Sequence, residues 1–256
     1  MSPVLDVAAA TDAGRVRALN EDYVAGDAAA GFAVLADGMG GHNAGEVASR
    51  MAAELVIAGV RSASRRNGTL DAALAETLVA SQVAAANAGV FEAAQAERRY
   101  DGMGTTLVVV LWHAAGVTWG HVGDSRLYLM RRGELRQLTR DHSIVQEQLE
   151  RGELSREEAR QSMNRNVLTR AVGIDPQVKA DVHSGAAEPD DVYLLCSDGL
   201  TDMVDDAYIE RTLCECGPQI RVAARRLIDE ANARGGLDNI SVILARVVGT
   251  AGTRPA

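Results

Sequence analysis

Four aspartates stand beside glycines at the ends of apolar runs. Asp37 and Asp198 each close such a run and precede a glycine. Asp124 and Asp238 each come shortly after a glycine at the edge of another run. A carboxylate beside a core is costly unless arginines, turn amides or cations compensate it. A single Asp-Gly pair is an ordinary turn signal, but four aspartates with the same pattern favour one shared metal centre.

Such a centre would offer hard oxygen ligands only, because none of the five histidines is paired at a ligand spacing. Oxygen ligands select magnesium, manganese or calcium rather than zinc or copper. Carboxylates that hold two cations about 3.5 to 4 Å apart can activate a water for attack on phosphorus. The four aspartates therefore predict a phosphoester hydrolase.

A further group of polar residues lies near the N-terminus, where Arg17 is followed by Asn20, Glu21 and Asp22. An arginine fork can bind two phosphate oxygens while metals polarise the third. Taken alone, Arg17 would be a surface arginine in a solvated loop. Beside the aspartates it is a candidate phosphate-binding residue.

The apolar runs that carry the aspartates are short and rich in β-branched residues, which predicts strands. Between 112 and 138 the strands follow one another through short turns, and this indicates antiparallel pairing. The predicted strands are 32–36, 107–112, 117–122, 126–130, 192–196 and 240–248.

Segment 141–172 interrupts this pattern with a polar stretch that predicts an exposed excursion rather than core. Within it, Ser155 stands at a helix N-cap position with Glu158 three residues later, which is the signature of a capping box. Grouped helices and grouped antiparallel strands indicate an α+β domain built in layers. Helices are predicted near 47–55 and 70–85, and for 144–151, 155–161 and 220–233.

The composition is that of a folded chain with an acidic surface. Its 256 residues are 47% hydrophobic, and 35 acidic against 26 basic residues give a net charge of -9. This balance argues against a nucleic-acid partner, which would need a basic face. The three cysteines cannot form a disulfide framework, the N-terminus lacks a signal-peptide pattern, and no apolar run could span a membrane. We expect a cytoplasmic protein, and a monomer because no apolar stripe is left unassigned.

Six motifs follow one another along the chain. They are Arg17-x-x-Asn20-Glu21-Asp22, Asp37-Gly38-Met39-Gly40-Gly41-His42, Gly102-Met103-Gly104-Thr105-Thr106, Gly123-Asp124-Ser125-Arg126, Cys196-Ser197-Asp198-Gly199-Leu200 and Gly236-x-Asp238-Asn239. This ordered set resembles the metal-dependent protein phosphatases of the PPM, or type 2C, class in its bacterial branch. The resemblance covers roughly residues 8–248, and the set is far more specific than any one motif.

The resemblance implies a four-layer α-β-β-α sandwich of two antiparallel sheets flanked by helix pairs, with the metal site at one end between the sheets. Residues 1–248 would form this single domain, with a mobile flap at about 141–172 and a frayed tail at 249–256. The implied activity is hydrolysis of phosphoserine and phosphothreonine in proteins with Mn2+ or Mg2+, held as two core ions and a weaker third. The implied partners are phosphoproteins and a cognate Ser/Thr protein kinase.

The resemblance also implies roles by position. Asp37 would bridge two metals, with the Gly38 carbonyl on one of them. Arg17 would hold the substrate phosphate, and Asn239 would support the ligands from behind. The other metal-site residues would be Asp198 and Asp238 on the second core metal, Asp124 with Asp198 at the third, and Glu21 and Asp22 through metal-bound waters.

One position departs from the eukaryotic relatives, which place a histidine directly after the Asp-Gly pair. Met39 stands there, and a methionine cannot donate a proton to the leaving alcohol. The leaving-group acid would be either His42 or a metal-bound water, and His42 could equally be a surface loop histidine. The Asp141-His142 pair starts the flap, which favours a structural or substrate-facing role over acid–base chemistry.

The predicted activity reverses a bacterial protein kinase by direct attack of a metal-activated water, without a phosphoenzyme. A small-molecule phosphoester substrate is a second hypothesis. A non-catalytic scaffold of the same fold is a third, which the loss of Asp37, Asp198 or Asp238 would have favoured. Cell-wall signalling, stress signalling and type VI secretion are the candidate settings, and a compact stand-alone chain suits the last of them.

Overall fold

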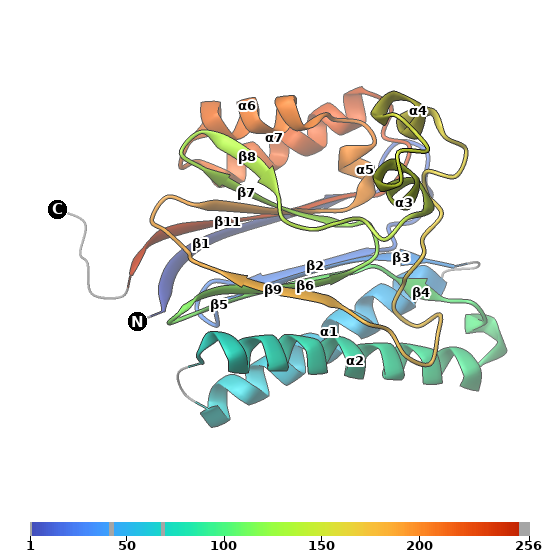
Figure 1. Cartoon of the computed structure of the whole chain (residues 1–256), viewed down its shortest axis with the longest axis horizontal. Helices are drawn as coiled ribbons and strands as arrows, with labels where there is room; N and C mark the ends of the chain where they lie inside the picture. The colour runs from blue at the N-terminus through green and yellow to red at the C-terminus, as the bar shows by residue number, and fades with distance from the viewer. Residues whose placement is uncertain (1, 41–43, 68–69, 251–256) are drawn as a thin grey trace.

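The computed structural model describes residues 2–40, 44–67 and 70–250 (Figure 1). Two antiparallel sheets lie face to face. One sheet has the strand order β1-β11-β10-β7-β8, and the other has the order β2-β3-β5-β6-β9 with the short β4 paired to β3. The strands are β1 (Pro3–Asp12), β2 (Asp22–Asp27), β3 (Phe32–Met39), β4 (Gly104–Thr105), β5 (Leu107–His113), β6 (Gly116–Val122), β7 (Arg126–Arg131), β8 (Glu134–Gln137), β9 (Asp181–Gly185), β10 (Val192–Cys196) and β11 (Ile240–Thr250).

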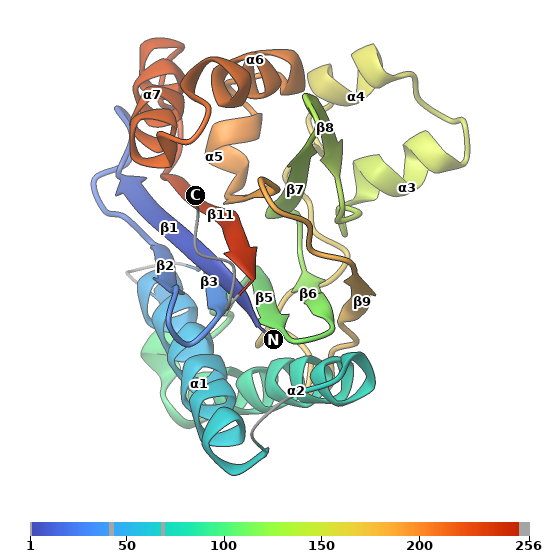
Figure 2. The same cartoon turned by 90° about the vertical axis from the view of Figure 1, so that its left-hand side faces the viewer.

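Helices cover the outer face of each sheet, as Figures 1 and 2 show from two sides. The pair α1 and α2 packs on the sheet that contains β3, and α6 and α7 pack on the sheet that contains β11. This arrangement confirms the predicted α+β fold class. The helices are α1 (Ala44–Asn67), α2 (Ala72–Ala96), the 3-10 helix η1 (Arg98–Tyr100), α3 (Ile144–Glu150), α4 (Arg156–Gln161), α5 (Asp198–Thr201), α6 (Asp206–Cys216) and α7 (Ile220–Ala233).

Three apolar layers hold the sandwich together. Val34 faces the core under α1 and α2, while its neighbour Leu35 faces the core between the sheets. In the other sheet, Leu194 faces the helices and Leu195 faces the opposite sheet. Because successive residues of a strand point to opposite faces, a strand buried on both sides must be apolar throughout. Polar groups of a site are therefore accommodated most easily near the strand ends.

Several helix boundaries follow from local signals. The predicted capping box of α4 is present, since Ser155 and Glu158 cap each other reciprocally. The predicted helix 220–233 coincides with α7. The α6 helix was not predicted, although Asp205 caps its first turn and Gly217 ends it.

The strands β1, β2 and β9 are among those that the sequence pattern did not predict. Each lies at the edge of its sheet, where one side of the strand is unpaired and the apolar pattern is weak. The strand β1 pairs with β11 from Pro3 opposite Thr250 to Asp12 opposite Ile240. The two ends of the described chain therefore lie side by side, and β11 runs two residues past the predicted boundary at 248.

The polar segment 141–172 carries α3 and α4 beside the two sheets (Figure 2). Its ends are attached by two isolated bridges, Ser143 to Leu168 and Thr105 to Val172. The helices predicted at 144–151 and 155–161 are confirmed, each to within one residue. Within the described ranges, no helix combines the length and apolar character that a membrane crossing would need.

Candidate metal centre

The aspartates singled out in the sequence converge at one end of the sandwich. Asp22 and Asp37 are cross-strand partners in β2 and β3. Asp124 follows β6, Asp198 begins α5 directly after β10, and Asp238 precedes β11. Burial raises the pKa of the Asp37 carboxyl well above its usual range, and the charges of the other four aspartates raise it further. Both sheets therefore contribute carboxylates to one cluster.

The same causes act on the neighbouring carboxylates. Burial raises the pKa of Asp22 to about 6 and the pKa of Asp124 to about 7. Burial also raises the pKa of Asp198 well above its usual range, and the charge of Asp124 adds to this effect. Like charges in a poorly solvated site disfavour the ionised form. The protein alone does not compensate the charge of this cluster.

Asp22 shows that the residues fit a cation. Its Oδ2 accepts a hydrogen bond from Ser197 Oγ at 2.9 Å, while its Oδ1 is buried without a hydrogen-bond partner. A buried acceptor without a partner is costly. A divalent cation with a preference for hard oxygen ligands would satisfy such atoms and offset the repulsion among the carboxylates. The donor set therefore fits Mn2+ or Mg2+.

The backbone around Asp37 is held in place by two threonines that the sequence analysis did not single out as site residues. Thr106 Oγ1 accepts a hydrogen bond from the Asp37 N–H at 3.0 Å, and Thr105 Oγ1 donates one to the Asp37 carbonyl at 2.8 Å. A Cβ on Gly38 would lie 2.1 Å from the Gly45 carbonyl oxygen. Only glycine fits at this position, so the Asp-Gly pair is required by packing as well as by chemistry.

Asn239 connects the N-terminal loop to Asp238. Its Oδ1 accepts a hydrogen bond from the Glu21 N–H at 2.8 Å, and its Nδ2 donates to the carbonyls of Ala13 and Leu19 at 3.0 and 2.8 Å. Its own N–H donates to Asp238 Oδ1 at 2.9 Å. The side chain thus fixes the loop between β1 and β2 against the start of β11, where the sequence analysis expected a supporting residue.

Arg17 lies at the rim of the cluster. Its Nη2 donates to Asp238 Oδ2 at 2.7 Å, and the side chains are 51% and 29% exposed. This hydrogen bond is the main cause that raises the pKa of Arg17, and the charges of Glu21 and Asp198 contribute. The guanidinium is therefore accessible from solvent and lies close to the carboxylates.

Asp202 is a carboxylate of this site that sequence reasoning missed. It ends α5, one helical turn after Asp198, and burial raises its pKa. Its Oδ2 lies 3.6 Å from Nε of Arg165 in the segment 141–172. The signal was present in the sequence, since two aspartates four residues apart share one face of a helix.

Met39 and His42 are the two residues on which the question of the leaving-group proton turns. Met39 is the last residue of β3, and its Cε lies close to Gly104. His42 lies outside the residues that the structure describes. The assignment of His42 therefore stays a prediction.

His121, His142 and Asp181 form a second polar cluster, with ligand atoms within 4.8 Å of one another. The Gly123 N–H donates to His142 Nδ1 at 3.1 Å, so the neutral ring carries its proton on Nε2, which faces Asp181 Oδ2 at 3.2 Å. A protonated ring nitrogen has no lone pair for a metal. We interpret this cluster as a hydrogen-bonded junction.

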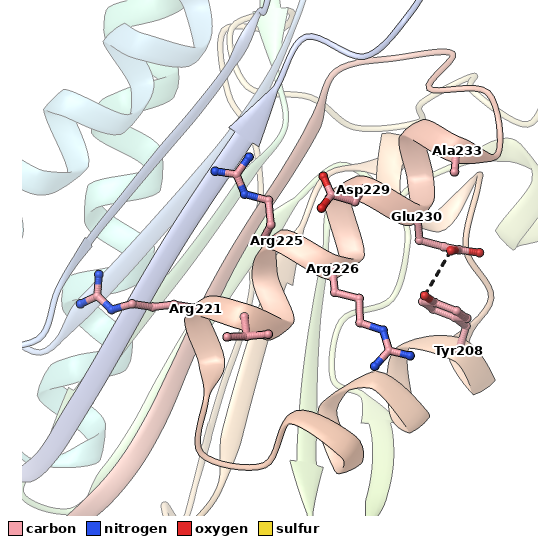
Figure 3. A pocket seen from close by; sticks show the side chains of 8 residues that line it. Tyr208, Arg221, Arg225, Arg226, Asp229, Glu230 and Ala233 are labelled. Atoms are coloured by element: carbon pink, nitrogen blue, oxygen red, sulfur yellow. Dashed lines mark hydrogen bonds between the residues drawn. The ribbon is translucent and has the colours of Figure 1, made fainter.

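A hollow of about 630 Å³ lies on the outer face of α6 and α7, and no carboxylate of the cluster lines it (Figure 3). The Tyr208 hydroxyl donates to Glu230 at 3.2 Å, and Arg226 binds Glu215 at 2.6 Å. Tyr208, Glu230 and Arg226, which line the hollow, are thus engaged in hydrogen bonds on the helix surface. We assign this hollow no part in the chemistry.

Comparisons with known proteins agree with this geometry. The family model Protein phosphatase 2C matches residues 12–229. The serine/threonine phosphatase stp of Listeria welshimeri is 39% identical over 237 residues, which cover 91% of this chain and 92% of the relative. The solved catalytic domain of the serine/threonine protein phosphatase PstP, in complex with two manganese ions, is 39% identical with a TM-score of 0.84, covering 96% of this chain and 99% of that one. PppA, a key regulatory component of T6SS in Pseudomonas aeruginosa, is 33% identical with a TM-score of 0.79 and the same coverage.

A two-sheet sandwich with a carboxylate cluster at one end defines a metal-dependent phosphoester hydrolase. The chain belongs to the protein phosphatase 2C family and is a serine/threonine phosphatase of its bacterial PPM branch. Its cofactor is Mn2+ or Mg2+, in agreement with the oxygen-only ligand set predicted from the sequence.

Removal of the cations is expected to destabilise the fold. A ligand that binds only the folded state at about 100 times its Kd adds about 2.7 kcal/mol, and each kcal/mol shifts the Tm of a chain of this size by roughly 2–4 °C. EDTA should therefore lower the Tm by roughly 5–10 °C, and excess Mn2+ should restore it. Calorimetry measures this shift. An equal Tm with Mn2+ and with EDTA would contradict a cation at the cluster.

Proposed function

We propose that this chain removes phosphate from phosphoserine and phosphothreonine side chains of proteins at the carboxylate cluster. One observation carries the proposal. Asp22, Asp37, Asp124 and Asp198, which come from both sheets, are buried carboxylates with raised pKa values at one end of the sandwich. The exposed Arg17 lies beside them, at Asp238. Such a site can hold cations and receive a phosphate dianion from solvent.

The cations would be held by oxygen atoms of residues already placed at the site. When bound, they would polarise a phosphate oxygen and acidify the attacking water. Asp37 lies at the centre of the cluster, which suits a carboxylate shared by two cations. The remaining ligands in this proposal are the Gly38 carbonyl, Asp198, Asp238 and Asp124, with Glu21 and Asp22 around them.

Arg17 would bind the phosphate. Its guanidinium already donates one hydrogen bond to the Asp238 carboxylate at 2.7 Å, and a guanidinium fork can donate two parallel hydrogen bonds to phosphate oxygens. Substrate binding would therefore move Arg17 from one oxyanion to another over a short distance. Asn239 would keep the loop that carries Arg17 in place, through its two hydrogen bonds to loop carbonyls.

The proton for the leaving alcohol has to come from a group other than Met39, because a thioether has none to donate. His42 and a water held at the cluster are the two candidates. The bond that breaks joins phosphorus to the serine or threonine oxygen, and that oxygen receives the proton. The other product is inorganic phosphate.

We propose that the chain acts in the cytoplasm as a monomer and reverses a cognate Ser/Thr protein kinase. Among the candidate settings, the likeness to PppA of Pseudomonas aeruginosa supports a role in type VI secretion. The likeness over almost its whole length to the Listeria phosphatase supports a general signalling role. Deletion of the gene, with phosphoproteomics of secretion and cell-wall proteins, separates the two.

The proposal predicts turnover of a phosphothreonine peptide by purified protein with Mn2+ and its loss with EDTA. A phosphoserine peptide and a panel of phosphorylated metabolites are compared under the same conditions by phosphate release. Higher kcat/KM for the peptides than for every metabolite is the expected result. Preference for a metabolite would establish the small-molecule alternative. A folded protein that binds Mn2+ and hydrolyses none of them would establish the scaffold alternative.

A further inference from the structure

His142 holds both backbone polar groups of Gly123, the residue directly before Asp124. Its N–H donates to the Gly123 carbonyl at 3.0 Å, and its Nδ1 accepts a hydrogen bond from the Gly123 N–H at 3.1 Å. The His142 side chain is 1% exposed. Hydrogen bonds made in such a buried place are well shielded from competing water. The ring and backbone of His142 thus fix the backbone of Gly123, and with it the position of Asp124 after the end of β6.

The far side of the His142 ring is also held. Its Nε2 faces Asp181 Oδ2 at 3.2 Å, and Asp181 Oδ1 accepts from Arg170 Nη1 at 2.8 Å. The ring of His121 stacks on it at 4.6 Å between centroids. Burial, with a contribution from His121, lowers the pKa of His142 to about 4. The ring is therefore neutral near pH 7, and its Nδ1 stays an acceptor.

Gly123 is linked in turn to the centre of the cluster. Its φ of 99° lies in a region that favours glycine, and a Cβ there would be 2.7 Å from the Thr106 side chain. Thr106 Oγ1 lies 2.7 Å from Ser125 Oγ, and it also accepts from the Asp37 N–H. A displacement of Gly123 would therefore disturb the Thr106 side chain, which contacts both Ser125, the residue after Asp124, and the backbone of Asp37.

We propose that His142 is a positioning residue of the metal centre, which acts through the hydrogen bond of its Nδ1 with Gly123 to hold the Asp124 carboxylate where a cation needs it. The proposal rests on the function proposed above, in which Asp124 is a ligand. Residues 169–170 attach to the same junction, since the Thr169 N–H donates to the His142 carbonyl at 2.9 Å. His142 therefore also connects the segment 141–172 to the cluster.

Two substitutions of His142 distinguish the role of its Nδ1 from the role of its Nε2. In His142→Asn the amide oxygen can replace Nδ1 as acceptor for the Gly123 N–H, whereas the bond to Asp181 is lost. In His142→Gln the amide reaches the place of Nε2, whereas the acceptor for Gly123 is lost. The control is His113→Asn, because His113 is a buried histidine near the far end of β5 that bonds Thr118.

The main readout is binding of Mn2+ to the folded protein, measured by calorimetry and by electron paramagnetic resonance without substrate. His142→Gln is expected to weaken the weakest Mn2+ site by roughly 10- to 100-fold, the usual effect of losing a group that orients a ligand. His142→Asn and His113→Asn should stay within about threefold of the wild type by the same measure. For phosphopeptide hydrolysis, His142→Gln should lower kcat and leave KM nearly unchanged.

A double-mutant cycle with Asp124→Asn decides whether His142 acts through Asp124. In the Asp124→Asn background, His142→Gln is expected to have no further effect on Mn2+ binding. Equal Mn2+ affinities of the Gln and Asn variants, or additive effects in the cycle, would overturn the proposal. Wild-type protein that binds Mn2+ but hydrolyses no phosphopeptide would defeat the proposed function only, because the Mn2+ affinities would still test the role of His142.

Discussion

Asp37→Asn is expected to lower kcat/KM for a phosphothreonine peptide by about a thousandfold or more. Asp37 is the carboxylate whose pKa responds to burial and to the charges of all four other aspartates, and we assign it to two cations at once. A metal ion that polarises a phosphoryl oxygen is worth several kcal/mol in the transition state, and about 1.4 kcal/mol is a factor of ten in rate. Loss of a shared ligand removes most of that contribution.

The fold should survive this substitution. The hydrogen bonds that hold this position use the backbone N–H and carbonyl of Asp37 with Thr106 and Thr105, and asparagine has nearly the same volume. It also removes one charge from a crowded cluster, so the Tm in EDTA should not fall. Asp229→Asn, on the exposed face of α7, is the matched control and should retain wild-type activity. Activity within tenfold of the wild type would contradict the assignment of Asp37.

The strands that could be predicted are those buried on both faces. In β5 every residue from Leu107 to His113 is buried, and such a run is unmistakable in a sequence. The edge strand β9 reads Asp-Val-His-Ser-Gly and is only partly buried, so its pairing partner rather than its composition makes it a strand. The same reason explains why β1 and β2 were missed.

The site was predictable where its residues interrupt a strong pattern. Asp37 and Asp198 are conspicuous because each comes at or near the end of a buried, apolar strand: Asp37 follows the run 32–36, and Asp198 follows β10 after one serine. The supporting hydrogen bonds were not predictable, because they join residues far apart in the chain. Ser197 binds Asp22, which lies 175 residues away in the sequence, and Asn239 binds the Glu21 N–H across 218 residues. Only the packing of the two sheets brings these partners together.

The sandwich itself explains why the cluster lies where it does. With apolar cores on both faces of each sheet, a carboxylate in the middle of a strand would be surrounded by apolar side chains. At the strand ends, carboxylates of the two sheets come together. The loop between β1 and β2 and the first turn of α5 lie at the same end of the sandwich. Holding these carboxylates together costs free energy, and the buried Oδ1 of Asp22, which has no hydrogen-bond partner, is one sign of that cost. Bound cations would offset it.

Arg17→Ala is expected to lower kcat/KM by roughly 10- to 150-fold, because a hydrogen bond to a charged group is worth roughly 1.5–3 kcal/mol. The larger part of the effect should appear in KM, since the guanidinium would bind the phosphate in substrate and transition state alike. The inhibition constant of inorganic phosphate should rise in parallel with KM. Arg17→Lys keeps the charge but not the two-pronged donor, so its loss should be intermediate.

Measurement of the Tm distinguishes a loss of phosphate binding in Arg17→Ala from damage to the fold. The Arg17 and Asp238 side chains are 51% and 29% exposed, and such exposed pairs contribute about 0–1 kcal/mol. The Tm of Arg17→Ala in EDTA should therefore stay close to that of the wild type. Arg225→Ala, on the exposed surface of α7 (Figure 3), removes an equal charge away from the cluster and should change neither KM nor phosphate inhibition. If Arg17→Ala and Arg225→Ala have the same KM, the phosphate does not bind at Arg17.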